Sequence, residues 1–279
     1  MAPDIDPHAK GQPSSSRSQD AWVSGDSYER YVGRWSRLVA REFIGWLSLP
    51  SGGNWLDVGC GTGALSAAIL DVASPRGVVG VDPSAAYIAH ASRQLTDDRA
   101  RFEVGDAEAL PYEPGSFDAV VSGLALNFVP HPERAVAEMA RVAVEDGVVA
   151  AYVWDYAGEM QFMRYFWDAA VALDPAADEL DEARRFPICR PESLTRLFQN
   201  AGLRSIKTRA IDIPTIFHDF DDYWSPFLGG QGPAPGYTMK LDEERRTALR
   251  ERIRASLPIA QDGSIQLLAR AWAVRGSRG

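Results

Sequence analysis

The stretch Leu56-Asp57-Val58-Gly59-Cys60-Gly61-Thr62-Gly63 decides the fold of this 279-residue chain. A β-rich run at 54–58 leads into it and a helical pattern at 64–71 follows it, so its glycines join a strand to a helix. Glycine permits a tight turn at this junction and lets a ligand approach the backbone closely. The stretch therefore predicts a ligand-binding glycine loop at the carboxyl end of a strand.

Strands and helices alternate outward from this loop. After the first strand at 54–58, further strands are expected at 78–81, 100–104, 117–122 and 148–153, and the helices between them at 64–71, 85–95 and 132–144. Strands that alternate with helices of this length imply a parallel sheet covered on both faces. We therefore expect an open, doubly wound α/β fold over 51–156.

The segments on either side of this core differ from it in composition. Residues 1–24 hold almost no apolar side chains and are expected to be a disordered tail. Residues 25–50 have the apolar spacing of an amphipathic helix. Beyond the core we expect cap-like helices over 157–202 and 214–258 and final strands over 203–213 and 264–275. The second helical segment surrounds a Gly/Pro-rich loop, and 25–279 is expected to be a single domain.

Composition excludes several classes of protein. The chain carries 38 acidic and 29 basic side chains, a net charge of −9, which argues against a general binder of nucleic acids. Its two cysteines and four scattered histidines match neither a disulfide framework nor a zinc site, so no metal is expected. Apolar runs are too short to span a bilayer, and the N-terminus lacks the apolar centre of a signal peptide. We therefore expect a cytoplasmic protein that does not engage membranes.

Three aspartates occupy the ends of successive strands. Asp57 lies two residues before the first loop glycine, where a carboxylate suits a cationic ligand group such as an ammonium or a sulfonium. Asp82 ends the second strand, where a carboxylate can accept both hydroxyls of a ribose. Asp106 follows the third strand and can accept from the exocyclic amine of an adenine. Each acid alone is compatible with a loop or cap residue, but the three together point to one adenosine-bearing, cationic ligand.

A dinucleotide site is the competing interpretation of the same loop. Gly59, Gly61 and Ala64 satisfy the relaxed dinucleotide fingerprint, which favours a nicotinamide-dependent oxidoreductase. A pyrophosphate, however, prefers helix-terminal N–H groups without a carboxylate beside them, and Asp57 would then have no role. A catalytically silent cofactor-binding protein is the third possibility.

The motifs resemble, in order and spacing, those of the class I S-adenosylmethionine-dependent methyltransferases, particularly the enzymes similar to ubiquinone and menaquinone biosynthesis methyltransferases. Residues 56–63 resemble the family's first motif, 81–84 its ribose-binding acidic turn and 105–112 its adenine-binding turn. The fourth strand and the helix after it also match, so that the resemblance covers about a third of the chain, 54–154. It implies a seven-stranded sheet whose last strand is antiparallel.

The resemblance also implies a cofactor, S-adenosylmethionine, which leaves as S-adenosylhomocysteine, and residues that bind it. The residues it assigns to the cofactor within the core are Asp57, Gly59, Gly61, Gly63, Asp82, Pro83, Ser84, Asp106, Ala107 and Leu124. In similar enzymes an N-terminal helix covers the cofactor. Tyr28 and Arg34 are therefore added, Arg34 as a bidentate partner of the cofactor carboxylate.

A small, partly hydrophobic acceptor is expected beside the end of the fourth strand, because ligands bind outside the carboxyl ends of strands in such sheets. Methyl transfer to an O, N or C atom of this acceptor needs positioning and exclusion of water, and no residue is assigned as a catalytic base. The residues predicted to contact the acceptor are Asn127, Trp154, Phe166, His218, Tyr223 and Trp224. Core packing is the alternative for the aromatic ones, since aromatic stripes at helical spacing usually face a core.

Overall fold

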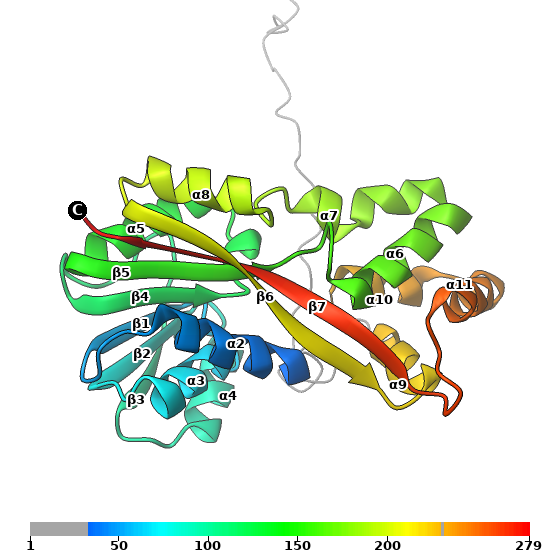
Figure 1. Cartoon of the computed structure of the whole chain (residues 1–279), viewed down its shortest axis with the longest axis horizontal. Coiled ribbons are helices and arrows are strands. Elements are labelled where there is room, and N and C mark those ends of the chain that lie inside the picture. The colour runs from blue at the N-terminus through cyan, green and yellow to red at the C-terminus, as the bar shows by residue number, and fades with distance from the viewer. Residues whose placement is uncertain (1–32, 230–231) are drawn as a thin grey trace, which may run out of the picture.

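The computed structural model describes residues 33–229 and 232–279 and contains one seven-stranded sheet (Figure 1). Its strands are β1 (Asn54–Val58), β2 (Gly77–Asp82), β3 (Ala100–Val104), β4 (Phe117–Gly123), β5 (Ala143–Trp154), β6 (Arg204–Phe217) and β7 (Ile265–Ser277). They stand in the order β3-β2-β1-β4-β5-β7-β6, and only β7 runs antiparallel to its neighbours, β5 and β6. The predicted doubly wound fold with an antiparallel last strand is confirmed.

Helices cover both faces of this sheet. One face carries α2 (Arg34–Leu47), α3 (Ala64–Val72) and α4 (Ala85–Gln94), and the other carries α5 (Pro132–Val142) and α8 (Pro191–Asn200) (Figure 1). The apolar side chains of α2 recur every three or four residues, so this helix buries a continuous stripe against the sheet. The core strands between the two helical layers are almost entirely buried, as expected of a parallel sheet covered on both faces.

A helical cap lies at the end of the sheet where β6 and β7 extend past the other strands (Figure 1). It consists of α6 (Gln161–Leu173), η3 (Pro175–Leu180), α7 (Glu182–Arg185), α9 (Phe220–Trp224), η4 (Ser225–Leu228), α10 (Pro233–Lys240) and α11 (Glu243–Ser256). The first three follow β5 and the others lie between β6 and β7. Both groups of helices meet where α6 packs against α10 and α11.

Stacked aromatic rings hold the cap together. Phe162 and Phe166 of α6 both stack on Phe227, with ring centroids 4.7 and 4.5 Å apart. Phe217 stacks on Phe162 at 5.5 Å, and the Tyr223 hydroxyl donates a 2.8 Å hydrogen bond to the Phe162 carbonyl. Because these rings pack against one another and are fully buried, the cap interior is a packed core.

The boundaries differ most from those expected from sequence at three places. β5 begins at Ala143, five residues before the predicted 148, and turns at Asp146, whose φ is 59°. β6 reaches Phe217 instead of 213, because it pairs with β7 along this length. Part of the expected Gly/Pro loop forms α10, which starts at Pro233, and proline fits the first turn of a helix. The predicted tail at 1–24 lies outside the described residues, and the division into segments of one domain stays a prediction.

Candidate functional site

A cavity of about 340 Å³ opens at the carboxyl ends of β1, β2 and β4. Its walls come from the glycine loop after β1, the turns after β2 and β3, and the segment that follows β4. Nine of the twelve residues predicted to bind a cofactor line it: Asp57, Gly59, Gly61, Asp82, Pro83, Ser84, Asp106, Ala107 and Leu124. The fold thus brings together side chains that are up to 67 positions apart in the sequence, from Asp57 to Leu124.

The backbone of the glycine loop adopts conformations that favour glycine. Gly59, Gly61 and Gly63 have φ angles of 73°, 51° and 89°. A Cβ on Gly59 would lie 2.5 Å from the Cβ of Ala125, so this loop packs directly against the segment after β4. Gly63 has a different role, since it does not line the cavity and a Cβ there would meet the side chain of Leu95 at 2.9 Å.

Asp82 ties two walls of the cavity together. Its Oδ2 accepts a 3.0 Å hydrogen bond from the Gly61 N–H, and its Oδ1 accepts a 2.9 Å hydrogen bond from the Ser84 N–H. Burial raises the pKa of Asp82, and the two backbone donors oppose this shift. Each carboxylate oxygen keeps a lone pair for a ligand, because these bonds use one apiece.

Asp57 is a fully buried carboxyl group at the end of β1. Its Oδ2 accepts a 2.7 Å hydrogen bond from the Ser66 hydroxyl, whereas its Oδ1 has no hydrogen-bond partner among the described residues. Burial raises the pKa of Asp57 to about 7; the Ser66 hydrogen bond opposes the rise and the charge of Asp82 adds to it. A buried, unpartnered carboxylate oxygen is costly, and a cationic donor in the cavity would satisfy it.

The third carboxylate stands at the open side of the cavity. Asp106 is exposed, and its Oδ1 accepts a 2.9 Å hydrogen bond from the Glu108 N–H, which fixes the turn after β3. Together with Asp57 and Asp82 it makes the lining acidic, since the described lining holds no lysine, arginine or histidine. Over the described ranges, no group of three or more metal-ligating side chains is present.

Several lining residues were not predicted from the sequence. Ser36 reaches the cavity from α2, and Tyr152 reaches it from inside β5. The Tyr152 hydroxyl lies against Gly123, where a Cβ would be only 2.5 Å from it. Phe128, at the end of η2 (Leu126–Phe128), also lines the cavity. The one sequence signal for it was its position shortly after the fourth strand.

The two remaining cofactor predictions are Arg34, the first residue of α2, and Tyr28. Arg34 does not line the cavity; its Nη1 is 3.1 Å from the Asp222 carboxylate, and its guanidinium lies over the rings of Trp35 and Phe217. The structure thus pairs Arg34 with the cap, where the sequence predicted a partner in the cofactor. Tyr28 lies outside the described residues.

None of the six residues predicted to contact the acceptor lines the cavity. Trp154, Phe166, Tyr223 and Trp224 are buried, which agrees with the alternative that the aromatic stripes form a core. A ring that is covered on all sides has no surface for a ligand. His218 is exposed and its backbone N–H donates to Asp222, while Asn127 is buried with its Nδ2 unpartnered within the described part of the chain.

Comparisons with known proteins identify the family of this chain. A family model described as a methyltransferase domain matches residues 56–151. The 2-phytyl-1,4-naphtoquinone methyltransferase of Thermosynechococcus vestitus is 33% identical over 178 residues, which are 59% of this chain and 78% of the relative. The 2-methyl-6-phytyl-1,4-hydroquinone methyltransferase of Synechocystis sp. is 28% identical over 254 residues, 80% of this chain and 77% of the relative.

A solved structure supports the fold. Phosphoethanolamine N-methyltransferase 2 of Haemonchus contortus, in complex with S-adenosyl-L-methionine, gives a TM-score of 0.56 at 16% identity, covering 94% of this chain and 58% of that one. These relatives give no support to an oxidoreductase, and the resemblance carried by the glycine loop and its carboxylates is confirmed. The chain belongs to the class I S-adenosylmethionine-dependent methyltransferases that act on small molecules.

Proposed function

We propose that the cavity binds S-adenosylmethionine through its three carboxylates and delivers the methyl group to an aromatic acceptor of the quinol type. One observation carries this proposal: Asp57, Asp82, Asp106 and the glycine loop line the same cavity. The described lining of this cavity has no cationic side chain. An acidic lining suits a ligand with an ammonium, a sulfonium and ribose hydroxyls. It disfavours the pyrophosphate of a dinucleotide.

Each carboxylate has a defined task in this proposal. Asp82 accepts the two ribose hydroxyls with the lone pairs that Gly61 and Ser84 leave free. Asp57 accepts from the ammonium with its unpartnered Oδ1. This buried oxygen without a partner is the observation that supports the fit of the cofactor to this chain. Asp106, at the open side, accepts from the adenine amine. Gly59 lets the methionine chain approach the backbone closely, because no side chain intervenes.

The cofactor, when bound, supplies an electrophilic methyl group that undergoes in-line displacement. The chain's contribution is to position both partners and to exclude water from between them. Leu124 serves this purpose at the end of β4: its φ of 58° is rare for a branched residue, and its N–H donates a 2.8 Å hydrogen bond to the Tyr152 carbonyl. This geometry turns the chain across the cavity so that Leu124 and Phe128 both border it.

The acceptor class rests on the relatives and on the apolar side of the cavity. The names of the two relatives specify phytyl-substituted naphthoquinone and hydroquinone rings. In this chain Leu124, Phe128, Val129 and Pro130 line the side of the cavity formed by the segment after β4. An apolar border suits a ring of this kind better than a sugar or a nucleic acid.

A thermal-shift panel tests the cofactor. At about 100 times its Kd, S-adenosylhomocysteine should stabilise the folded chain by about 2.7 kcal/mol and raise Tm by roughly 5–10 °C, whereas NADH should leave Tm unchanged. A shift with NADH and none with S-adenosylhomocysteine would refute the proposal. A cofactor-dependent shift without methyl transfer to naphthols, hydroquinones or amines would instead favour a catalytically silent binding protein.

Affinity for S-adenosylhomocysteine should depend on pH through Asp57. Below pH 7 this buried carboxyl group becomes protonated, because its pKa is raised to about 7, and it then offers the ammonium no charge. We expect Kd to rise by up to about tenfold per pH unit below 7 and to level off above it. Calorimetric titrations between about pH 5.5 and 8.5 measure this. Asp57→Asn should bind more weakly at pH 8 with a flatter profile, and an equally steep profile in that variant would remove Asp57 from this role.

A further inference from the structure

We propose that Phe128 and Phe186 form an aromatic wall that receives the ring of the acceptor, that the buried Tyr156 ring supports Phe186, and that Arg164 positions this wall. The inference rests on the proposed function and specifies where its acceptor binds. Phe128 lines the cavity with about 40% of its surface exposed. Its ring meets that of Phe186 edge to face, with centroids 5.2 Å apart and an interplanar angle of 77°, and Phe186 in turn contacts Tyr156 at 5.9 Å. The rings therefore extend from Phe128 in the cavity lining toward the cap.

The wall differs from the aromatic cluster inside the cap. There the rings of Phe162, Phe166 and Phe227 are fully buried, whereas Phe128 is exposed and Phe186 is half-buried. The Arg185 guanidinium lies 5.2 Å from the centroid of the Phe186 ring. An exposed aromatic edge beside a cofactor-sized cavity can be covered by a planar ring, which gains from the quadrupoles of its neighbours as well as from burial.

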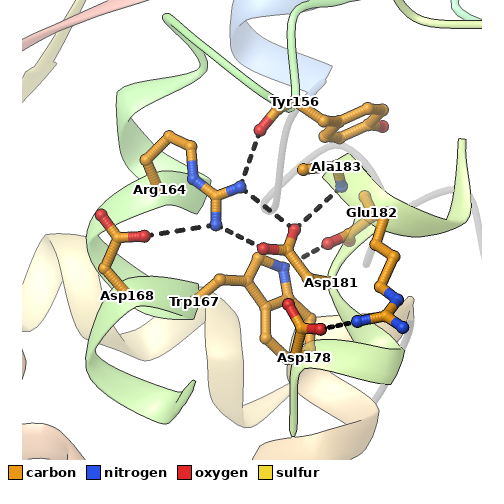
Figure 2. A network of polar contacts seen from close by, with 9 residues as sticks. Tyr156, Arg164, Trp167, Asp168, Asp178, Asp181, Glu182 and Ala183 are labelled. Carbon is orange, nitrogen blue, oxygen red and sulfur yellow. Dashed lines mark hydrogen bonds and ion pairs between the residues drawn. The ribbon is translucent and has the colours of Figure 1, made fainter. Parts of the chain in front are cut away.

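The Arg164 guanidinium links the segment that carries Tyr156 to the segment that precedes Phe186; Figure 2 shows its contacts to Tyr156 and Asp181. Arg164 of α6 donates from Nη1 to the Tyr156 carbonyl at 2.9 Å, and from Nη2 to the Asp181 carboxylate at 2.6 Å. Asp181 caps α7 by accepting from the Ala183 N–H at 2.8 Å, and Phe186 is the C-cap residue that directly follows α7. Since Tyr156 follows β5 and Phe186 follows α7, Arg164 fixes the position of the Phe186 ring against the Tyr156 ring that supports it. It is a positioning residue.

The geometry points to an aromatic acceptor and not merely an apolar one. Edge-to-face contacts need a π system, and a saturated ring of the same outline gains only burial. The pair 1-naphthol and decahydro-1-naphthol separates these contributions, because both have the same carbon skeleton and one hydroxyl. Neither compound undergoes redox cycling as a hydroquinone does.

The experiment titrates both probes into the full chain saturated with S-adenosylhomocysteine. We expect 1-naphthol to bind roughly 2- to 10-fold more tightly than decahydro-1-naphthol. Phe186→Leu should remove this preference, and Phe186→Tyr should retain it. Tyr237→Leu is the matched control, since the Tyr237 ring packs on Phe166 and Trp167 inside the cap. It should leave the preference unchanged.

Two outcomes would overturn the wall without touching the cofactor assignment. Equal binding of the two probes to the wild type would show that no aromatic surface is used, and an unchanged preference in Phe186→Leu would exclude Phe186. Binding of S-adenosylhomocysteine is measured first in the same titration. Its absence would refute the proposed function itself, so the two failures are distinguishable.

Discussion

Replacing Asp82 by asparagine should weaken the binding of S-adenosylhomocysteine at least about 100-fold. Hydrogen bonds to a charged group are worth about 1.5–3 kcal/mol each, and Asp82 would lose two of them to the ribose. The amide would also bring its own N–H donors toward one of the two backbone N–H groups, of Gly61 or Ser84, that donate to the carboxylate. A loss of about 2.7 kcal/mol already corresponds to 100-fold, so the expected effect lies at or beyond this value.

Calorimetry on Asp82→Asn measures this effect, with Asp71→Asn as the control. Asp71 is an aspartate as well, 3.0 Å from Arg41 in an ion pair, but both side chains are exposed and neither lines the cavity. It should bind S-adenosylhomocysteine as the wild type does. A change of less than threefold in Asp82→Asn, in a variant that unfolds at the wild-type temperature, would contradict the ribose assignment.

The sheet could be predicted from sequence because its signals are local. β1 and β3 lie exactly where the β-rich runs at 54–58 and 100–104 placed them. The glycine loop and three aspartates were found for the same reason, since each follows directly on a strand end. What escaped prediction depends on pairing between distant segments: β6 extends to Phe217 because β7 pairs with it there.

The residues predicted to contact the acceptor do not line the cavity, for a different physical reason. Phe166 and Phe186 are both aromatic residues after β5, and sequence cannot show which ring the tertiary packing covers. The structure buries Phe166 against Phe227 and leaves Phe186 half-exposed beside Phe128. Ser36 and Tyr152 could not be predicted, because the sequence around an interior position of a helix or strand does not indicate that the side chain faces a cavity.

The second large effect is expected from Arg164→Met, which should destabilise the chain by about 3 kcal/mol. The Arg164 and Asp181 side chains are only 17% and 10% exposed, so removal of the guanidinium leaves a largely buried carboxylate without its cation. The neighbouring Glu182 cannot replace the lost cation. Its carboxyl group accepts from the Trp167 indole, and burial raises its pKa to about 8. Urea unfolding at pH 7 measures the loss.

A neighbouring ion pair provides the control for this prediction. Arg184 and Asp178 pair on the same segment, but their side chains are 64% and 42% exposed (Figure 2). Arg184→Met should therefore cost no more than about 0.5 kcal/mol. Adding Asp181→Asn to Arg164→Met should restore part of the lost stability. Asparagine removes the unpaired negative charge at position 181 and can still cap α7. If the double variant is as unstable as the sum of the two single ones, the ion pair is not what anchors the wall. The cost of Arg164→Met would then come from the lost packing of its aliphatic stem.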